Sequence, residues 1–176
     1  MTLSRRHLIQ RGLAGGLLLA AGGVGLTLQN SVLRQPSGPL LALTELEFSV
    51  LSFAADRITP GTDTVPSASG LGVPELIDTL LARMHPVELA DFKKVLNTLE
   101  NAAIGLLLDA RPVPFTSAAP ETQSRALASW RDSSLTLRRT GYRALHKVCT
   151  SAYWGMPETF PLSGYPGPPN FSRGNR

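Results

Sequence analysis

Between residues 44 and 154, apolar side chains return at every third or fourth position, which is the spacing of one face of a helix. No stretch alternates strictly between apolar and polar residues, as a half-buried strand would. The pattern therefore predicts an all-α fold, a small helical domain of about five helices. The expected helices run from Thr44 to a stop at Pro60 and Gly61, from Pro74 to Met84, from Val87 to Leu108, from Pro120 to Trp130 and from Ser134 to Trp154.

Two of these helices begin at recognisable start signals. Thr44 is followed three residues later by Glu47, so that each side chain can accept a hydrogen bond from the other residue's backbone amide in a capping box. Pro74 suits the first position of a helix, where the backbone amide needs no partner. In the last helix, Gly141 indicates close packing, because glycine weakens a helix interior by about 1 kcal/mol relative to alanine.

Segments without the helical period flank this domain. Residues 1–34 form a leader that contains an uncharged run from Gly12 to Leu33. Residues 35–43 are rich in proline and glycine and are expected to be a linker to the helical domain of residues 44–154. Residues 155–176 hold five of the fourteen prolines, so an extended Pro/Gly-rich C-terminal tail is expected there.

The formal net charge of +4 comes entirely from the leader, which holds four arginines and no acidic residue. From residue 35 onward, 13 Lys and Arg residues balance 13 Asp and Glu residues. A protein that binds nucleic acid needs a basic face to neutralise phosphates. The neutral body therefore excludes the usual electrostatic basis for nucleic-acid binding.

The leader has the organisation of an export signal. Ser4, Arg5, Arg6 and Leu8 resemble the motif of a twin-arginine signal, and the apolar run behind them is weakened by glycines. The uncharged run is also long enough to cross a hydrocarbon core of about 30 Å, and no clear A-x-A cleavage site follows it. A cleaved signal and an uncleaved membrane anchor both stay open. In either case we expect the twin-arginine translocase to carry the folded body to the periplasm.

A search for catalytic chemistry along the body gives no candidate. Haem attachment through C-x-x-C-H and iron–sulfur ligation need two or more cysteines, and Cys149 is the only cysteine of the chain. Nucleotide-binding and hydrolase motifs are absent. His146 and Cys149 lie three residues apart on one helix face, but two ligands do not close a zinc site. We therefore expect no catalytic, cofactor-binding or metal-binding residue on this chain.

Cys149 is nevertheless a candidate contact residue for a partner. A single cysteine in an exported protein is either buried and inert or available to another chain. The oxidising periplasm would permit a disulfide to a partner subunit. Burial and an intersubunit disulfide are the two interpretations.

The start of the tail is the second candidate for a partner interface. Trp154, Phe160 and Tyr165 offer large contact areas, and Pro166 and Pro168 leave the segment little conformational entropy to lose. Such a segment is suited to a groove on a partner, or else it packs on its own domain. Both interpretations stay open.

A set of short motifs spans nearly the whole chain. Besides the leader, they are Ala55 to Gly61 (ADRITPG), Gly72 to Asp78 (GVPELID), Trp130 to Ser133 (WRDS), Arg139 with Tyr142, and Gly164 to Pro169 (GYPGPP). In this order the motifs resemble the gluconate 2-dehydrogenase subunit 3 family. Each motif alone is weak, whereas their order and the closing segment are fairly specific.

The resemblance implies a non-catalytic accessory subunit that escorts, exports and stabilises a larger partner. In this family the partner is an FAD-dependent sugar, polyol or alcohol dehydrogenase of the glucose–methanol–choline (GMC) type, in a periplasmic, membrane-associated complex. A multihaem cytochrome c commonly accepts the electrons. FAD is therefore expected on the partner and no cofactor on this chain. A free-standing exported enzyme of unrecognised type and a membrane-tethered binding module are the alternatives.

Overall fold

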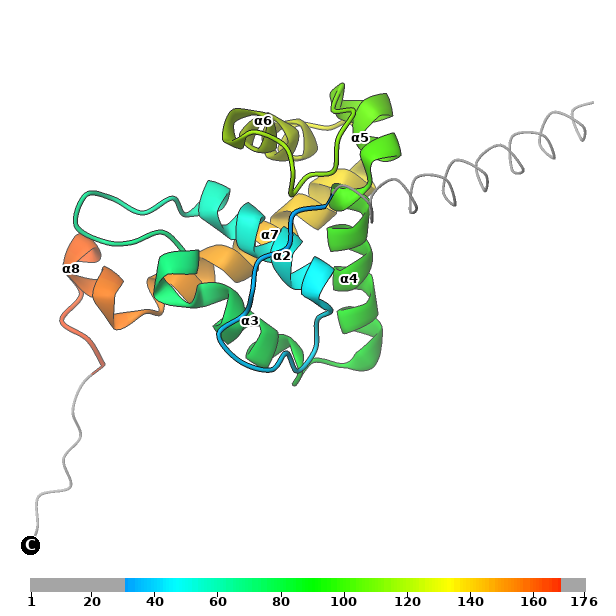
Figure 1. Ribbon diagram of the computed structural model, residues 1–176. Coiled ribbons are helices and arrows are strands. Elements are labelled where there is room, and N and C mark those ends of the chain that lie inside the picture. The colour runs from blue at the N-terminus through cyan, green and yellow to red at the C-terminus, as the bar shows by residue number, and fades with distance from the viewer. Residues whose placement is uncertain (1–30, 169–176) are drawn as a thin grey trace, which may run out of the picture.

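The computed structural model describes residues 31–168, so the signal residues Ser4, Arg5, Arg6 and Leu8 lie outside the described part of the chain. All regular structure within residues 31–168 is helical, which confirms the all-α prediction (Figure 1). None of the helices described there combines the length and the apolar content needed to cross a membrane. The elements are α2 (Glu45–Ile58), η1 (Ser69–Leu71), α3 (Val73–Leu81), α4 (Pro86–Glu100), α5 (Ala102–Asp109), α6 (Pro120–Arg131), α7 (Thr136–Trp154), η2 (Pro157–Thr159) and α8 (Phe160–Ser163).

Helix α2 lies at the centre of the domain and packs against α3, α4, α6 and α7 (Figure 1). Its capping box is present, since the Thr44 amide donates to the Glu47 carboxylate at 2.9 Å and the Glu47 amide donates to the Thr44 hydroxyl at 3.3 Å. Most of its residues are buried, which is expected of a helix enclosed by its neighbours. The surrounding helices complete the core with Ile77, Leu81, Phe92, Leu96, Leu99, Leu127, Trp130, Leu145 and Cys149.

The helix predicted from Val87 to Leu108 is in fact two helices. Asn101 leaves the helical conformation with ψ 116°, and its side-chain oxygen accepts a hydrogen bond from the Ile104 amide at 3.0 Å. Asn101 therefore ends α4 and caps the start of α5, a role for which asparagine is well suited. The apolar spacing continues through the break, and for this reason it does not reveal the change of direction.

Residues 31–43, which we call the strap, lie along the helical domain and bind to it through buried carboxylates. Asp78 of α3 accepts hydrogen bonds from the backbone amides of Leu41, Ala42 and Leu43, at 2.7 to 3.1 Å. The Leu43 side chain belongs to the hydrophobic core. The segment expected as a linker is thus held on α3 over its last three residues.

The tail begins with helical turns where an extended chain was expected. Residues 157–163 form η2 and α8, and Gly164 ends α8 in the left-handed conformation with φ 69°. The prolines in this stretch lie in the first turn of each element, where a missing backbone amide costs nothing. Their number predicted an extended tail, but their positions permit short helices. The last eight residues, 169–176, lie outside the description.

Candidate partner-binding surface

A long apolar groove of about 1360 Å³ opens between α3, α4 and α7. Its apolar lining is contributed mainly by leucine, valine, methionine and aromatic side chains of these helices. Large apolar residues of the lining include Leu76, Leu80, Met84, Phe92, Val95, Trp130, Leu137 and Val148. No element within residues 31–168 covers the groove.

Helix α3 explains why the groove exists. Its buried residues Val73, Ile77 and Leu81 are spaced by four, so they form one stripe that faces the core. Leu76 and Leu80 form a second stripe on another side of the same helix, and they are 37% and 47% exposed. An amphipathic helix needs only one such stripe to fold onto its domain. The second stripe therefore faces the groove without a partner.

The floor of the groove is closely packed. A Cβ atom on Gly141 would lie 3.2 Å from Cζ3 of Trp130 and 3.2 Å from Cγ2 of Val95. The glycine thus lets α7 approach α4 and α6 more closely than a larger residue would, as its place in the sequence indicated.

Leu137 lies at the α7 side of the groove, in the first turn of that helix, and its side chain is 80% exposed. Together with Leu80, it leaves the groove with apolar side chains on two opposing helices.

Charged side chains border the groove on both sides. On α4, Asp91 and Lys94 form an exposed ion pair of 2.8 Å. On α7, Lys147 lines the groove and Arg138 is occupied by a buried ion pair with Asp109. Helix α7 contains four lysines and arginines and no acidic residue, and of these Arg138 and Lys147 line the groove.

The lining of the groove is mainly apolar. Its polar groups are threonine and serine hydroxyls and the charged side chains of Glu88, Asp91, Lys94, Arg138 and Lys147. Among residues 31–168, no three His, Cys, Asp or Glu side chains gather closely enough to hold a metal ion. Apolar side chains of another molecule are what this lining accommodates best.

The candidate contact residues of the tail follow the groove along the chain. Gly155, at the end of α7, is the last residue that lines the groove. Trp154 is 48% exposed and makes an edge-to-face contact with Tyr153. Phe160 is half-buried, and its ring meets the ring of Tyr165 edge-to-face at 5.1 Å. Pro166 and Pro168 are exposed. The structure thus brings Phe160 and Tyr165 together, while Trp154 stands on α7.

Cys149 lies apart from these residues, fully buried in the core. Burial raises the pKa of its thiol to about 12. The reactive thiolate is therefore suppressed, and the sulfur is not at the surface where a disulfide to another chain would form. Of the two interpretations of Cys149, burial is therefore the one that agrees with the structure.

His85 and His146 have local roles. The His85 side chain accepts a hydrogen bond from the Val87 amide and so caps α4. His146 is exposed on α7 and contacts the Tyr142 ring, with 5.6 Å between ring centroids. Within the described residues, neither histidine belongs to a group of His, Cys, Asp and Glu side chains that could hold a metal ion.

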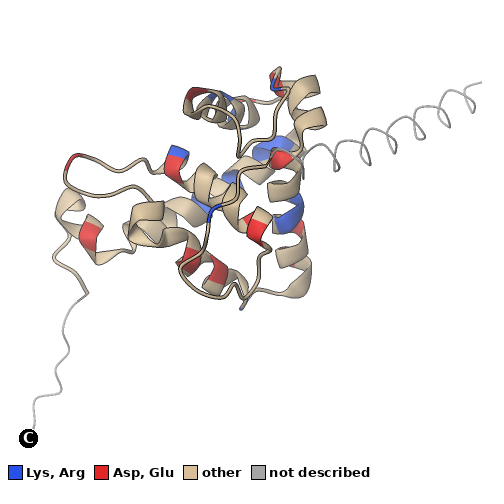
Figure 2. Cartoon of the chain, in the orientation of Figure 1, with Lys and Arg blue, Asp and Glu red and all other residues tan. Residues whose placement is uncertain are grey.

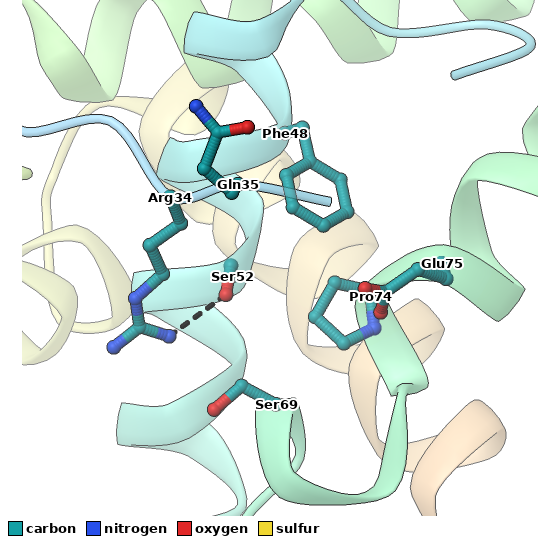
Figure 3. A pocket seen from close by; sticks show the side chains of 7 residues that line it. All are labelled: Arg34, Gln35, Phe48, Ser52, Ser69, Pro74 and Glu75. Atoms are coloured by element: carbon teal, nitrogen blue, oxygen red, sulfur yellow. Dashed lines mark hydrogen bonds between the residues drawn. The ribbon is translucent and has the colours of Figure 1, made fainter. Parts of the chain in front are cut away.

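A second, smaller hollow of about 260 Å³ lies between the strap, α2 and the start of α3 (Figure 3). Arg34 of the strap reaches into it and donates to Ser52 at 2.7 Å and to Asp56 at 2.6 Å. Burial alone would raise the pKa of Asp56, but hydrogen bonds from Ser69 and Arg34 lower it below its ordinary value. Arg34 is thus paired with Asp56, and Glu75 accepts hydrogen bonds from Ser37, so contacts at this hollow fasten the strap to α2 and α3.

Sequence reasoning missed both the groove and the fastening of the strap. The groove had a visible signal, because α3 carries more apolar residues than a one-sided helix needs. The ion pair of Arg34 with Asp56 had no signal in the sequence, because residues 22 positions apart cannot be paired from local spacing.

Comparison with known proteins adds the last observation. The family model described as gluconate 2-dehydrogenase subunit 3 matches residues 45–159, which is more than half of the chain. The match includes every helix that lines the groove and ends before Phe160. Among curated proteins and among solved structures, no match was found.

Proposed function

The chain belongs to the gluconate 2-dehydrogenase subunit 3 family, and on that premise we propose that it is the non-catalytic small subunit of a periplasmic dehydrogenase complex. Its partner in this proposal is an FAD-dependent large subunit of the GMC type that oxidises a sugar, polyol or alcohol. The small subunit escorts this partner through the twin-arginine translocase and stabilises it. A multihaem cytochrome c receives the electrons.

The uncovered groove between α3, α4 and α7 is the observation that carries this proposal. A monomeric protein rarely leaves so large an apolar surface open to water, and such surfaces mark contacts with other proteins or membranes. The hollow is formed by the helices that the family match covers.

The occupant that fits the groove best is an amphipathic helix of the large subunit. Its apolar side chains would lie on Leu76, Leu80 and Leu137, in the helix-in-groove mode of recognition. Its acidic residues would lie beside α7, because that helix is basic and Lys147 has no ion pair among the described residues.

Co-purification tests the proposal. The tagged full-length chain is produced in its native host, isolated from the periplasmic and membrane fractions, and assayed for bound FAD. We expect a flavoprotein to accompany the wild-type chain. In the double variant Leu80→Asp/Leu137→Asp, recovery should fall about tenfold or more, because two charges would lie against the apolar helix.

The matched control is Leu135→Asp, which places the same charge on an exposed leucine outside the groove. Both variants must keep the thermal unfolding midpoint of the wild type. A wild-type chain that brings down no flavoprotein would refute the accessory role. If the double variant and the control recovered equal amounts of flavoprotein, the accessory role would stand but the groove would not be the site that binds the large subunit.

A further inference from the structure

A second apolar surface, distinct from the groove, surrounds α5. We call it the α5 patch; its members are Val32, Leu33, Leu106, Leu107, Leu108 and Val113, with exposed fractions from 39% for Val113 to 71% for Leu107. Three consecutive leucines point outward on an eight-residue helix, and they cover about 200° of its circumference. A run of this kind is unusual on a surface that faces only water.

Helix α5 is held firmly in this orientation. The Arg111 amide donates to the Gly105 carbonyl, and the Arg111 guanidinium donates to the Leu99 carbonyl at 2.6 Å and to the Val113 carbonyl. Asn101 caps the other end of the helix. The leucines are therefore presented outward by a fixed element, not by a frayed one.

The patch also contains no charge. Helix α5 has no charged residue before Asp109, whose carboxylate is buried in its ion pair with Arg138, and Figure 2 colours the helix tan, as uncharged, over most of its length. Arg34, the first charged residue after Leu33, is turned towards Asp56 on α2. The residues that make up the α5 patch are therefore all uncharged.

The strap places the leader beside this patch. The Ser31 hydroxyl donates to the Glu100 carboxylate at 2.6 Å, and the Val32 amide donates to the Thr116 hydroxyl at 3.0 Å. Glu100 is the last residue of α4, two positions before α5 begins. Because α5 is about 12 Å long, the first described residues of the strap, Ser31 and Val32, lie within a short distance of the exposed leucines.

The uncharged run of 22 residues from Gly12 to Leu33 therefore ends inside the patch, with Val32 and Leu33 belonging to both. We propose that the α5 patch rests on the lipid surface of the membrane, next to the point where the leader enters it. Apolar side chains on a short helix can lie at the boundary of headgroups and acyl chains without spanning the bilayer. This inference rests on the proposed function only in taking the leader as a membrane segment.

Lipid-borne quenching tests this placement. The full-length chain, carrying Leu107→Cys labelled with an environment-sensitive fluorophore, is reconstituted with its large subunit into phosphatidylcholine and phosphatidylglycerol vesicles that contain brominated lipid. Native Cys149 does not compete for the label, because it is buried. We expect a blue shift and a loss of fluorescence. The matched control, Leu41→Cys, carries the label on a comparably exposed leucine outside both the groove and the α5 patch and should show no loss caused by brominated lipid.

Two results would overturn the inference. One is an unquenched label at residue 107 in vesicles. The other is a blue shift at residue 107 when the large subunit is added without vesicles, since the patch would then be a protein contact. Co-elution of the large subunit is measured in the same sample, so a failure of complex formation is recognised separately from a failure of lipid contact.

Discussion

Gly105 leaves the space in which the buried guanidinium of Arg111 lies. A Cβ atom at residue 105 would be 2.6 Å from Nη2 and 2.7 Å from Cζ of Arg111. Burial lowers the pKa of Arg111, while the negative charges of Glu100 and Asp109 act in the opposite direction. The guanidinium stays bound to three carbonyl groups, and this set of bonds connects α4, α5 and the following loop.

Gly105→Ala should therefore destabilise the protein, although alanine favours a helix by about 1 kcal/mol over glycine. The displaced guanidinium would lose hydrogen bonds while buried, so we expect the free energy of unfolding to fall by about 2 kcal/mol. Urea denaturation measures the change. Gly38→Ala is the control, since no atom lies within 4 Å of the added group, and it should leave stability nearly unchanged. A Gly105→Ala protein as stable as wild type would contradict the packing described.

Cys149 gives the protein a specific alkaline sensitivity. Its thiol has a pKa of about 12 in the folded protein and 9.0 without the effect of burial. Between these values the unfolded chain releases the proton and the folded chain keeps it, so the free energy of unfolding falls by about 1.4 kcal/mol per pH unit. Below about pH 9 both states are protonated and the effect is absent.

Comparing the wild type with Cys149→Ala isolates this contribution, because all other titrating groups are shared. We expect the wild type to lose more stability than the variant when urea unfolding is repeated at about pH 8 and about pH 10.5. Parallel losses would mean that the thiol is accessible to water.

At the scale of elements, the strap behaves as part of the domain although it has no regular structure. Arg34 donates to Ser52 and Asp56, its amide donates to Ser49, and its guanidinium lies 3.9 Å from the centroid of the Phe53 ring. All of these partners belong to α2. Opening the strap would leave the buried Asp56 carboxylate without its cation, which is costly.

Limited trypsinolysis should report on this closure. Arg34 is the only lysine or arginine between Arg11 and Arg57, so cleavage after it is read unambiguously by mass spectrometry. Cleavage requires the strap to open, and its rate follows the population of the open form. We expect Asp56→Asn to be cut after Arg34 about tenfold faster than wild type, because a charge-assisted hydrogen bond is lost.

Asp63→Asn is the matched control for this experiment. It removes the same charge from an exposed position in the loop after α2 and should not alter the rate. Equal rates for wild type and Asp56→Asn would show that Arg34 does not fasten the strap.

The elements also show where sequence reasoning succeeds. Capping signals act between residues three positions apart, and both Thr44 with Glu47 and the proline at the start of α3 lie where predicted. Asn101 is equally local, yet an uninterrupted apolar period concealed it. Proline content misled at η2 and α8 because proline breaks a helix only beyond its first turn.

For the whole molecule, periodicity was enough to predict the all-α class but not which apolar stripe would be covered. Leu76 and Ile77 look alike in the sequence, and only the packing of α3 decides that Ile77 is buried and Leu76 lies in the groove. The same holds for Leu137 and Leu145 on α7. A binding surface made of ordinary leucines has no motif, so it emerges only when the helices are assembled.

The α5 patch follows the same logic on another part of the domain. Neither Val32 nor Leu107 is unusual by itself, and they are about 75 positions apart in the chain. The bonds of the strap to Glu100 and Thr116 bring their segments together. The molecule thus presents one apolar surface to a proposed protein partner and another to a proposed lipid surface.

Helix α3 joins the N-terminal end of the body to the groove. Asp78 accepts hydrogen bonds from three successive backbone amides of the strap, while Leu76 and Leu80 of the same helix line the groove. Because Asp78 and these leucines lie on one nine-residue helix, a partner that displaced α3 from the groove side would also strain its three hydrogen bonds to the strap.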